Sequence, residues 1–168
     1  MSEIKHVLSN IWGYQSFRVG QEDIINHILQ KKSLLAVLPT GAGKSLCFQL
    51  PALLFKNQTI VISPLVSLMD NQVSSLKDIG VKAERVHSDM HEEDRNKIWK
   101  NFKQGGIKIL YISPESLMRK SVVSELKLLN IDMFVVDEAH CISKWGSDFR
   151  KNYEELKELG KHFPNSII

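Results

Sequence analysis

The sequence contains few cysteines and no long hydrophobic run. Its 168 residues include two cysteines, Cys47 and Cys141, which are too few for a disulfide framework, and no CxxC pair or Cys/His cluster suggests zinc. No apolar stretch reaches the roughly 18–20 residues of a membrane-spanning helix. The N-terminal residues also lack the apolar core of a signal peptide. We therefore expect a protein of a reducing compartment with no membrane partner.

The sequence also lacks a strong excess of charge of either sign. It has 22 Lys and Arg against 19 Asp and Glu, a net charge of +3, which neither announces nor excludes a nucleic-acid partner because local placement decides. Hydrophobic residues make up 43% and charged residues 24%, and no repeat or low-complexity segment is present. The length favours a single domain that carries its own core.

Short apolar runs alternate with amphipathic stretches along most of the chain. The β-branched, nearly uninterrupted runs predict strands buried on both faces of a parallel sheet at 33–38, 59–63, 107–113 and 131–138, with a weaker candidate at 82–87. Apolar residues at helical spacing predict helices around 24–29, 46–54, 65–79, 98–102 and 149–159. This alternation indicates an α/β fold with helices on both faces of the sheet. Because residues 166–168 read as the start of a further strand, we expect the chain to be a fragment of a longer protein.

Residues 38–45, LPTGAGKS, have the composition of a phosphate-binding loop between a predicted strand and a predicted helix. The glycines permit tight turns that aim backbone N–H groups at phosphate oxygens, and the helix beginning near Lys44 adds its positive dipole end. Lys44 can reach the β- and γ-phosphates of a nucleotide, and the Ser45 hydroxyl can bind Mg²⁺. Leu38 stands where the strict pattern has glycine. The alternative is a plain glycine turn between a strand and a helix.

A second polar cluster, Asp137, Glu138 and His140, follows the apolar run at 131–138. Ligands of open α/β sheets sit beyond the carboxyl ends of strands, which is where these side chains are expected. Asp137 can hold Mg²⁺, Glu138 can orient and deprotonate the attacking water, and His140 can report the state of the γ-phosphate. Two acids after an apolar strand are common, so the phosphate loop is what gives this cluster weight.

The segment 12–21, WGYQSFRVGQ, offers a stacking face at Tyr14, a cationic plane at Arg18 and an amide at Gln21 that suits the N6 and N7 edge of adenine. From composition alone, a solvated loop is the more common interpretation of such a segment.

Taken together, these motifs resemble the first motor lobe of RecQ-family DNA helicases, within helicase superfamily 2. The resemblance runs from about residue 8 to the end and includes VISPLVSLMDNQV, LYISPESL and VVDEAHCISKWGSDFR besides the two segments above. It implies a RecA-like lobe that uses ATP and Mg²⁺ and that drives 3′-to-5′ unwinding of duplex DNA. The lobe is expected to span 1–168 and to break off before the family's motif III.

The resemblance also implies roles for individual residues. It implies that the Tyr14 ring stacks on the adenine base of ATP and that Arg18 and Gln21 contact the same base. The phosphate cradle that it implies comprises Thr40, Gly41, Ala42, Gly43, Lys44 and Ser45. The resemblance implies that Ser45 and Asp137 bind Mg²⁺. It also implies that DNA contact is coupled to ATP turnover by Trp145, Phe149 and Arg150.

Three positions depart from the family pattern. Val19 and Lys151 stand where proline is common, and Ser147 stands where histidine is common. Ser147 bears on how strongly the aromatic-rich loop around it couples DNA contact to ATP turnover. Ser63 and Ser113 each precede a proline at the end of a predicted strand, where backbone N–H groups can hold phosphates of a single strand or simply begin a helix.

The sequence thus favours an ATP-dependent DNA helicase lobe whose partners are single-stranded and duplex DNA and a second RecA-like lobe. The alternatives are a nucleotide-binding module without turnover and a DExH RNA helicase lobe. The DEAH spelling at 137–140 and the CISKWGSDFR loop argue against the RNA classes. The expected location is the nucleoid-bearing cytoplasm of a bacterium or the nucleus of a eukaryote.

Overall fold

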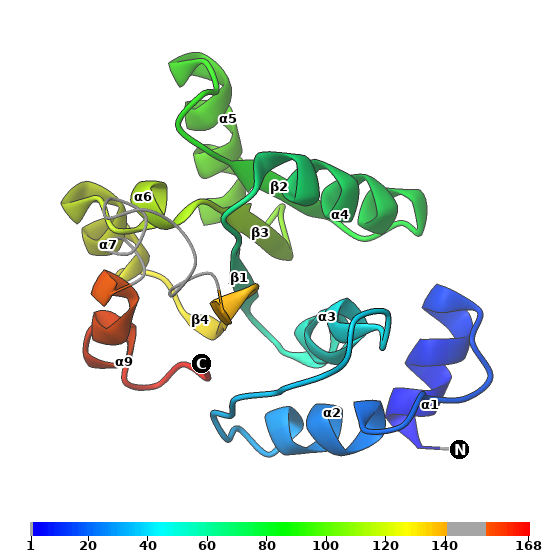
Figure 1. Ribbon diagram of the computed structural model, residues 1–168. Coiled ribbons are helices and arrows are strands. Elements are labelled where there is room, and N and C mark those ends of the chain that lie inside the picture. The colour runs from blue at the N-terminus through cyan, green and yellow to red at the C-terminus, as the bar shows by residue number, and fades with distance from the viewer. Residues whose placement is uncertain (1, 141–153) are drawn as a thin grey trace. The chain divides into compact units, whose positions relative to one another are not determined.

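The computed structural model describes residues 2–140 and 154–168 (Figure 1). The described residues divide into two compact units, one of residues 2–56 with 167–168 and one of residues 57–140 with 154–166. Within the described ranges, no helix is both long and apolar enough to cross a membrane.

The first unit is helical and is built around a small apolar cluster. Its helices are α1 (Glu3–Val7), the π-helical turn η1 (Leu8–Trp12), α2 (Gln21–Leu29) and α3 (Lys44–Leu54). Buried Leu8, Ile25 and Leu50 lie at the centre of this cluster, one from each of three helices. The apolar spacing seen in 24–29 and 46–54 therefore forms helices, as predicted, and their apolar faces pack on one another.

The second unit contains a four-stranded parallel sheet in the order β2-β3-β1-β4 (Figure 1). Its strands are β1 (Gln58–Ile62), β2 (Ala83–Val86), β3 (Ile109–Ile112) and β4 (Ile131–Val136). Its helices are α4 (Val66–Asp78), α5 (Glu92–Lys103), α6 (Pro114–Leu117), α7 (Lys120–Leu126), the 3₁₀ turn η3 (Leu156–Glu158) and α9 (Leu159–His162). These elements confirm four of the five predicted strands, and they confirm the α/β class.

The order of the strands determines which face each helix covers. The chain crosses from β1 past β3 to β2 in one direction, and returns from β2 to β3 and from β3 to β4 in the other. Because such crossovers are right-handed, α4 covers one face, and α5 covers the other together with α6 and α7. The Tyr111 hydroxyl on β3 lies 3.4 Å from Gln72 Oε1 on α4, which agrees with this arrangement.

The strand predicted at 33–38 is wrong. The structure assigns no strand there, and the side chains of Leu35 and Val37 are 79% and 85% exposed. The segment makes two hydrogen bonds with the end of the chain, from Leu34 N–H to the Ile168 carbonyl and from Ile168 N–H to Ser33 Oγ. A β-branched, apolar run forms a strand only where a neighbouring strand pairs with its backbone N–H and C=O groups. Two hydrogen bonds at one end of the run do not provide such a ladder of backbone pairs.

Candidate nucleotide and DNA site

The phosphate loop lies in the first unit and leads directly into α3. Gly41 and Gly43 have φ angles of +78° and +77°, which L side chains rarely adopt, and α3 begins at Lys44. The N–H groups of the first turn of a helix have no acceptor within the helix, so they are available to an anion. Lys44 and Ser45 are half-buried in that first turn, and Thr40 is exposed before the loop. The residues present therefore fit a nucleotide phosphate.

The side chain of Gln21 is bonded to this loop. Its Nε2 donates to the carbonyls of Ala42 at 3.2 Å and Gly43 at 3.0 Å, and its Oε1 accepts from the backbone N–H of Arg18 at 2.8 Å. Gln21 is buried, and the Arg18 guanidinium donates to the Gly41 carbonyl. The segment in which the sequence predicted adenine contacts thus holds the phosphate loop, while the adenine contacts themselves stay predictions. Sequence patterns missed this link because the partners are backbone carbonyls, which no residue type marks.

Two further side chains of the first unit, Tyr14 and Cys47, differ in their exposure to solvent. Tyr14 is 54% exposed, so its ring face is open to a stacking partner. Cys47 is buried one turn into α3, and its Sγ lies 3.9 Å from the Gly43 carbonyl. Burial raises the pKa of the Cys47 thiol from 9.0 to about 11, so the thiol is neutral near pH 7. Cys47 is therefore a buried, unreactive thiol.

The acidic cluster lies at the carboxyl end of β4 in the second unit. Asp137 N–H continues the sheet ladder by donating to the Ile62 carbonyl at 2.9 Å, and Asp137 Oδ1 accepts the N–H of Glu138 at 2.9 Å. Glu138 has a φ angle of +53°, a left-handed conformation that is uncommon outside glycine and that clusters at functional sites. His140 Nε2 lies 3.2 Å from Glu138 Oε2. The three residues that the sequence singled out are therefore linked through Glu138.

The two serines expected to face a DNA strand extend the same edge of the sheet. Ser63 N–H donates to the Ile112 carbonyl and Ser113 N–H to the Val86 carbonyl, so both serines directly follow their strands in register. Ser113 Oγ lies 2.9 Å from Ser116 Oγ. The Ser63 hydroxyl is buried and has no hydrogen-bond partner among the described residues. The edge beyond β1 and β3 thus carries two hydroxyls, one of which has no acceptor or donor within the described part of the protein.

A third polar residue on this edge escaped the sequence patterns. His87 directly follows β2, is buried, and has no partner for its Nδ1 within residues 2–140 and 154–168. Its only sequence signal is its position as the last residue of the weak strand candidate at 82–87. The predicted coupling residues Trp145, Phe149 and Arg150, and Ser147 with them, lie outside the described residues.

A sequence profile of DEAD/DEAH box helicases matches residues 18–167 of the chain. The chain belongs to the DEAD/DEAH box helicase family. Among curated relatives, the chain is 44% identical over 162 residues to the ATP-dependent DNA helicase RecQ of Haemophilus influenzae. The aligned residues cover 96% of this chain and 26% of that relative. The chain is 43% identical to the probable ATP-dependent DNA helicase RecS of Bacillus subtilis, covering 96% of the chain and 32% of the relative.

These relatives support the resemblance to the first motor lobe of RecQ-family helicases. The helicase-family chain spans about a quarter to a third of the length of the two relatives. Solved helicase structures share its fold. MrfA bound to DNA and AMPPNP is similar over 99% of this chain and 26% of its own, with a TM-score of 0.75 and 23% identity. A hypothetical ATP-dependent RNA helicase from Sulfolobus tokodaii is similar over 99% of this chain and 48% of its own, with a TM-score of 0.76 and 19% identity. This agreement confirms the RecA-like α/β fold.

Proposed function

We propose that the chain is the ATP-binding lobe of a DNA helicase motor. The observation that carries the proposal is the glycine-turned loop that opens onto the first turn of α3 at Lys44. That arrangement suits the phosphates of a nucleotide, and the RecQ-type relatives are ATP-dependent DNA helicases. The proposed extent of the lobe is the whole of residues 1–168.

The proposed work of the loop residues is to bind and orient the triphosphate. The Lys44 ammonium binds the β- and γ-phosphates, and the N–H groups between Thr40 and Ser45 supply further donors. Gln21 keeps the loop in its turned shape through the Ala42 and Gly43 carbonyls. The exposed ring of Tyr14 is suited to stack on the adenine base, with Arg18 beside it.

The proposed work of the acidic cluster is to hold a metal and to move a proton. Ser45 and Asp137 offer the hard oxygen ligands that suit Mg²⁺, which supplies positive charge to the phosphates when bound. Glu138 Oε2 accepts a proton from the attacking water, and His140 at 3.2 Å orients that carboxylate. His140 is also 56% exposed, so it can pass a change at Glu138 to whatever it faces.

The proposed DNA contacts follow the carboxyl edge of the second unit. Ser63 and Ser113 lie in register beyond neighbouring strands, and the edge that they mark is proposed to follow successive phosphates of one strand. Trp145, Phe149 and Arg150 are proposed to stack on bases and to couple DNA contact to ATP turnover. Unwinding in the 3′-to-5′ direction and a cytoplasmic or nuclear location are part of the same proposal.

A nucleotide-binding module without turnover is the second candidate for the chain by itself. It is favoured by the fact that the RecQ relative is about four times as long as the matched region. The resemblance to superfamily 2 motors implies that the arginine which stabilises the transferring phosphoryl group lies on a second lobe. Such an arginine raises the rate of phosphoryl transfer by about 10³–10⁵. We therefore propose that residues 1–168 bind ATP weakly and neither hydrolyse it appreciably nor unwind DNA.

The test of the proposed function is ATP affinity, measured with a fluorescent ATP analogue. Lys44→Ala should weaken binding at least tenfold because charge-assisted bonds to phosphate are lost. Lys56→Ala, which removes an exposed lysine of the same unit, should leave affinity unchanged. Glu138→Gln should bind ATP normally, since the amide fails only as a proton acceptor. Equal affinities for Lys44→Ala and the wild type would refute the phosphate-loop assignment.

A further inference from the structure

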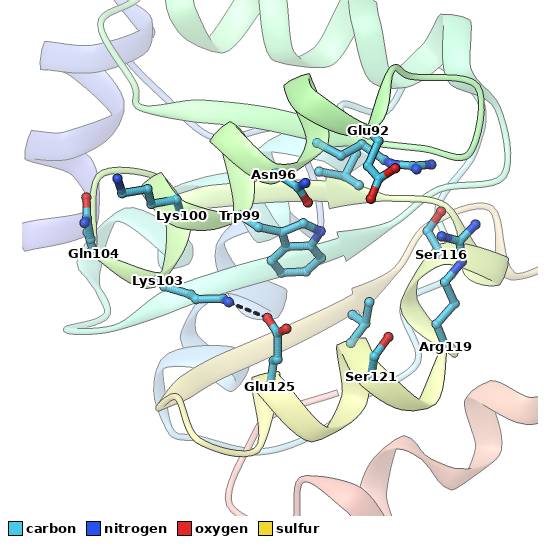
Figure 2. Close-up of a pocket in the computed structure, with 13 residues that line it drawn as sticks. Glu92, Asn96, Trp99, Lys100, Lys103, Gln104, Ser116, Arg119, Ser121 and Glu125 are labelled. Carbon is cyan, nitrogen blue, oxygen red and sulfur yellow. Dashed lines mark ion pairs between the residues drawn. The ribbon is translucent and has the colours of Figure 1, made fainter.

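A groove runs between α5 and α7 on the face of the second unit opposite α4. It encloses about 590 Å³, a volume typical of small-ligand sites, and lies wholly within this unit. Figure 2 shows the Trp99 indole extending from α5 across the middle of the groove toward α7. Arg119 and Ser116 lie at one end, and Lys100 and Lys103 lie at the other.

The lining of the groove favours an anion. Four cationic side chains line it, against the two carboxylates of Glu92 and Glu125. Glu125 is already paired with Lys103 at 2.5 Å. The side chains of Lys100 and Arg119 make no hydrogen bond or ion pair with any residue that the structure describes. Two cations at opposite ends of the groove are thus available to a ligand with negative charges at both ends.

Trp99 adds a binding surface of a different kind. It is half-buried, and its ring meets the fully buried ring of Phe102 edge to face, with centroids 5.8 Å apart and planes at 82°. This contact fixes the indole at its base while the rest of the ring lines the groove. A fixed aromatic surface between cations is the combination that binds unpaired nucleic-acid bases without regard to sequence.

The groove continues the edge of the sheet along which the DNA contacts are proposed to lie. Ser116 lies in its wall, and Ser116 Oγ is 2.9 Å from Ser113 Oγ. A strand held at Ser113 therefore has the Arg119 end of the groove as its immediate neighbour. An acidic peptide would also satisfy the cations, but neither the aromatic surface nor the continuity with Ser113 favours it.

We infer that this groove binds a nucleotide of single-stranded DNA beyond the contact at Ser113, with its base on Trp99 and its flanking phosphates beside Arg119 and Lys100. The inference rests on the proposed function, since it extends the path of the strand that the lobe is proposed to hold. It adds a binding surface outside the helicase motifs, on α5, where the sequence predicted a helix around 98–102, and on α7, which the sequence did not predict.

The inference is tested by the affinity of the chain for fluorescein-labelled oligothymidylate, measured by anisotropy at several salt concentrations. Trp99→Ala should weaken binding about fivefold to a hundredfold because the base no longer stacks on the indole. The double variant Lys100→Ala/Arg119→Ala should weaken binding and reduce the salt slope by about 1.4, or about 0.7 for each phosphate that the variant no longer neutralises. The matched control Lys97→Ala/Lys127→Ala removes two exposed lysines that do not line the groove, and its slope should stay at the wild-type value.

The outcomes separate this inference from the proposed function. Oligonucleotide binding that is equal in the wild type and both groove variants would overturn the inference and leave the proposed function intact. Failure of the wild-type chain to bind the oligonucleotide would overturn both the inference and the proposed DNA contact. Binding of polyglutamate but not of the oligonucleotide would also overturn it, in favour of an acidic protein partner. ATP affinity should be the same in every groove variant, and an unchanged thermal unfolding midpoint should show that the second unit remains folded in each of them.

Discussion

The Gln21 side-chain amide donates to the carbonyl of Gly43 at 3.0 Å, and so joins the first residue of α2 to the last residue before α3. The same amide group donates to Ala42, and its oxygen accepts from the backbone N–H of Arg18. Within the loop between Pro39 and Lys44, the Ala42 N–H donates to the Pro39 carbonyl, and the Arg18 guanidinium donates to the Gly41 carbonyl from outside. The side chains of Gln21 and Arg18 together hold the loop in its turned shape. The phosphate loop is therefore positioned by a helix that precedes it in the sequence.

Gln21→Ala is expected to weaken ATP and GTP binding alike, by about tenfold, because the loop loses two carbonyl partners while the base edge is not involved. Fluorescent analogues of both nucleotides would measure this. Gln30→Ala, at the exposed end of the same helix, is the matched control and should change neither affinity. A loss confined to ATP would show instead that the amide leaves the loop to contact adenine, as the sequence interpretation expected.

Gly43→Ala is expected to abolish detectable nucleotide binding. Its φ of +77° is strained for alanine, and a methyl group there would lie 2.5 Å from Gln21 Nε2. Gly80→Ala shares the strain, with a φ of +80°, but its methyl group would meet nothing within 4 Å. That control should lose about 1 kcal/mol of unfolding free energy and keep its ATP affinity. Normal binding by Gly43→Ala would contradict the close approach of Gln21.

Cys47 is expected to make the protein less stable as the pH rises from about 9 to about 11. Burial raises the pKa of the folded thiol from 9.0 to about 11, so over this window the unfolded chain releases a proton that the folded chain retains. The two-unit difference corresponds to about 2–3 kcal/mol at its upper limit. Urea unfolding of the wild type and of Cys47→Ala across this range isolates the contribution. Parallel stability curves for the two proteins would exclude it.

Asp132→Ala is expected to lower the unfolding free energy by about 1–3 kcal/mol. The Asp132 carboxylate accepts from the backbone N–H of Asn57 at 2.6 Å and from Asn57 Nδ2 at 3.1 Å, which ties β4 to the start of β1. Burial lowers the pKa of Lys108, and the charge of Asp132 opposes that shift, so removing the carboxylate should lower the pKa further. Thermal unfolding should show a smaller loss for Asp78→Ala, which removes an exposed carboxylate from the end of α4.

The predicted strands show where sequence patterns succeed. The runs at 59–63, 107–113 and 131–138 became β1, β3 and β4, and the weaker candidate at 82–87 became β2. Each of these strands has a neighbour in register that satisfies its backbone groups. The run at 33–38 is similarly apolar, but among the described residues it makes only two hydrogen bonds with another segment, both near its start. A residue pattern records burial and β-branching, but it does not record which segment supplies the partner ladder.

The chemistry of the candidate site could be read from the sequence in the same way, because glycine, lysine and carboxylates at fixed spacing define local geometry. The residue pattern predicted the glycine turns at Gly41 and Gly43 and a helix beginning near Lys44, and the structure has both. The sequence also placed Asp137 and Glu138 at the end of a strand, where the structure has them.

What the tertiary structure decided was which distant residues meet. It bonded Gln21 to a loop about twenty residues away, turned Glu138 into a left-handed conformation beside His140, and aligned buried His87 with the serines of the neighbouring strand ends. It also placed Trp99 opposite α7, so that a residue read only as a helix marker lines a cationic groove. Local propensity acts over a few residues, whereas these contacts are made by packing helices and strands that are far apart in the chain, and only the folded protein specifies that packing.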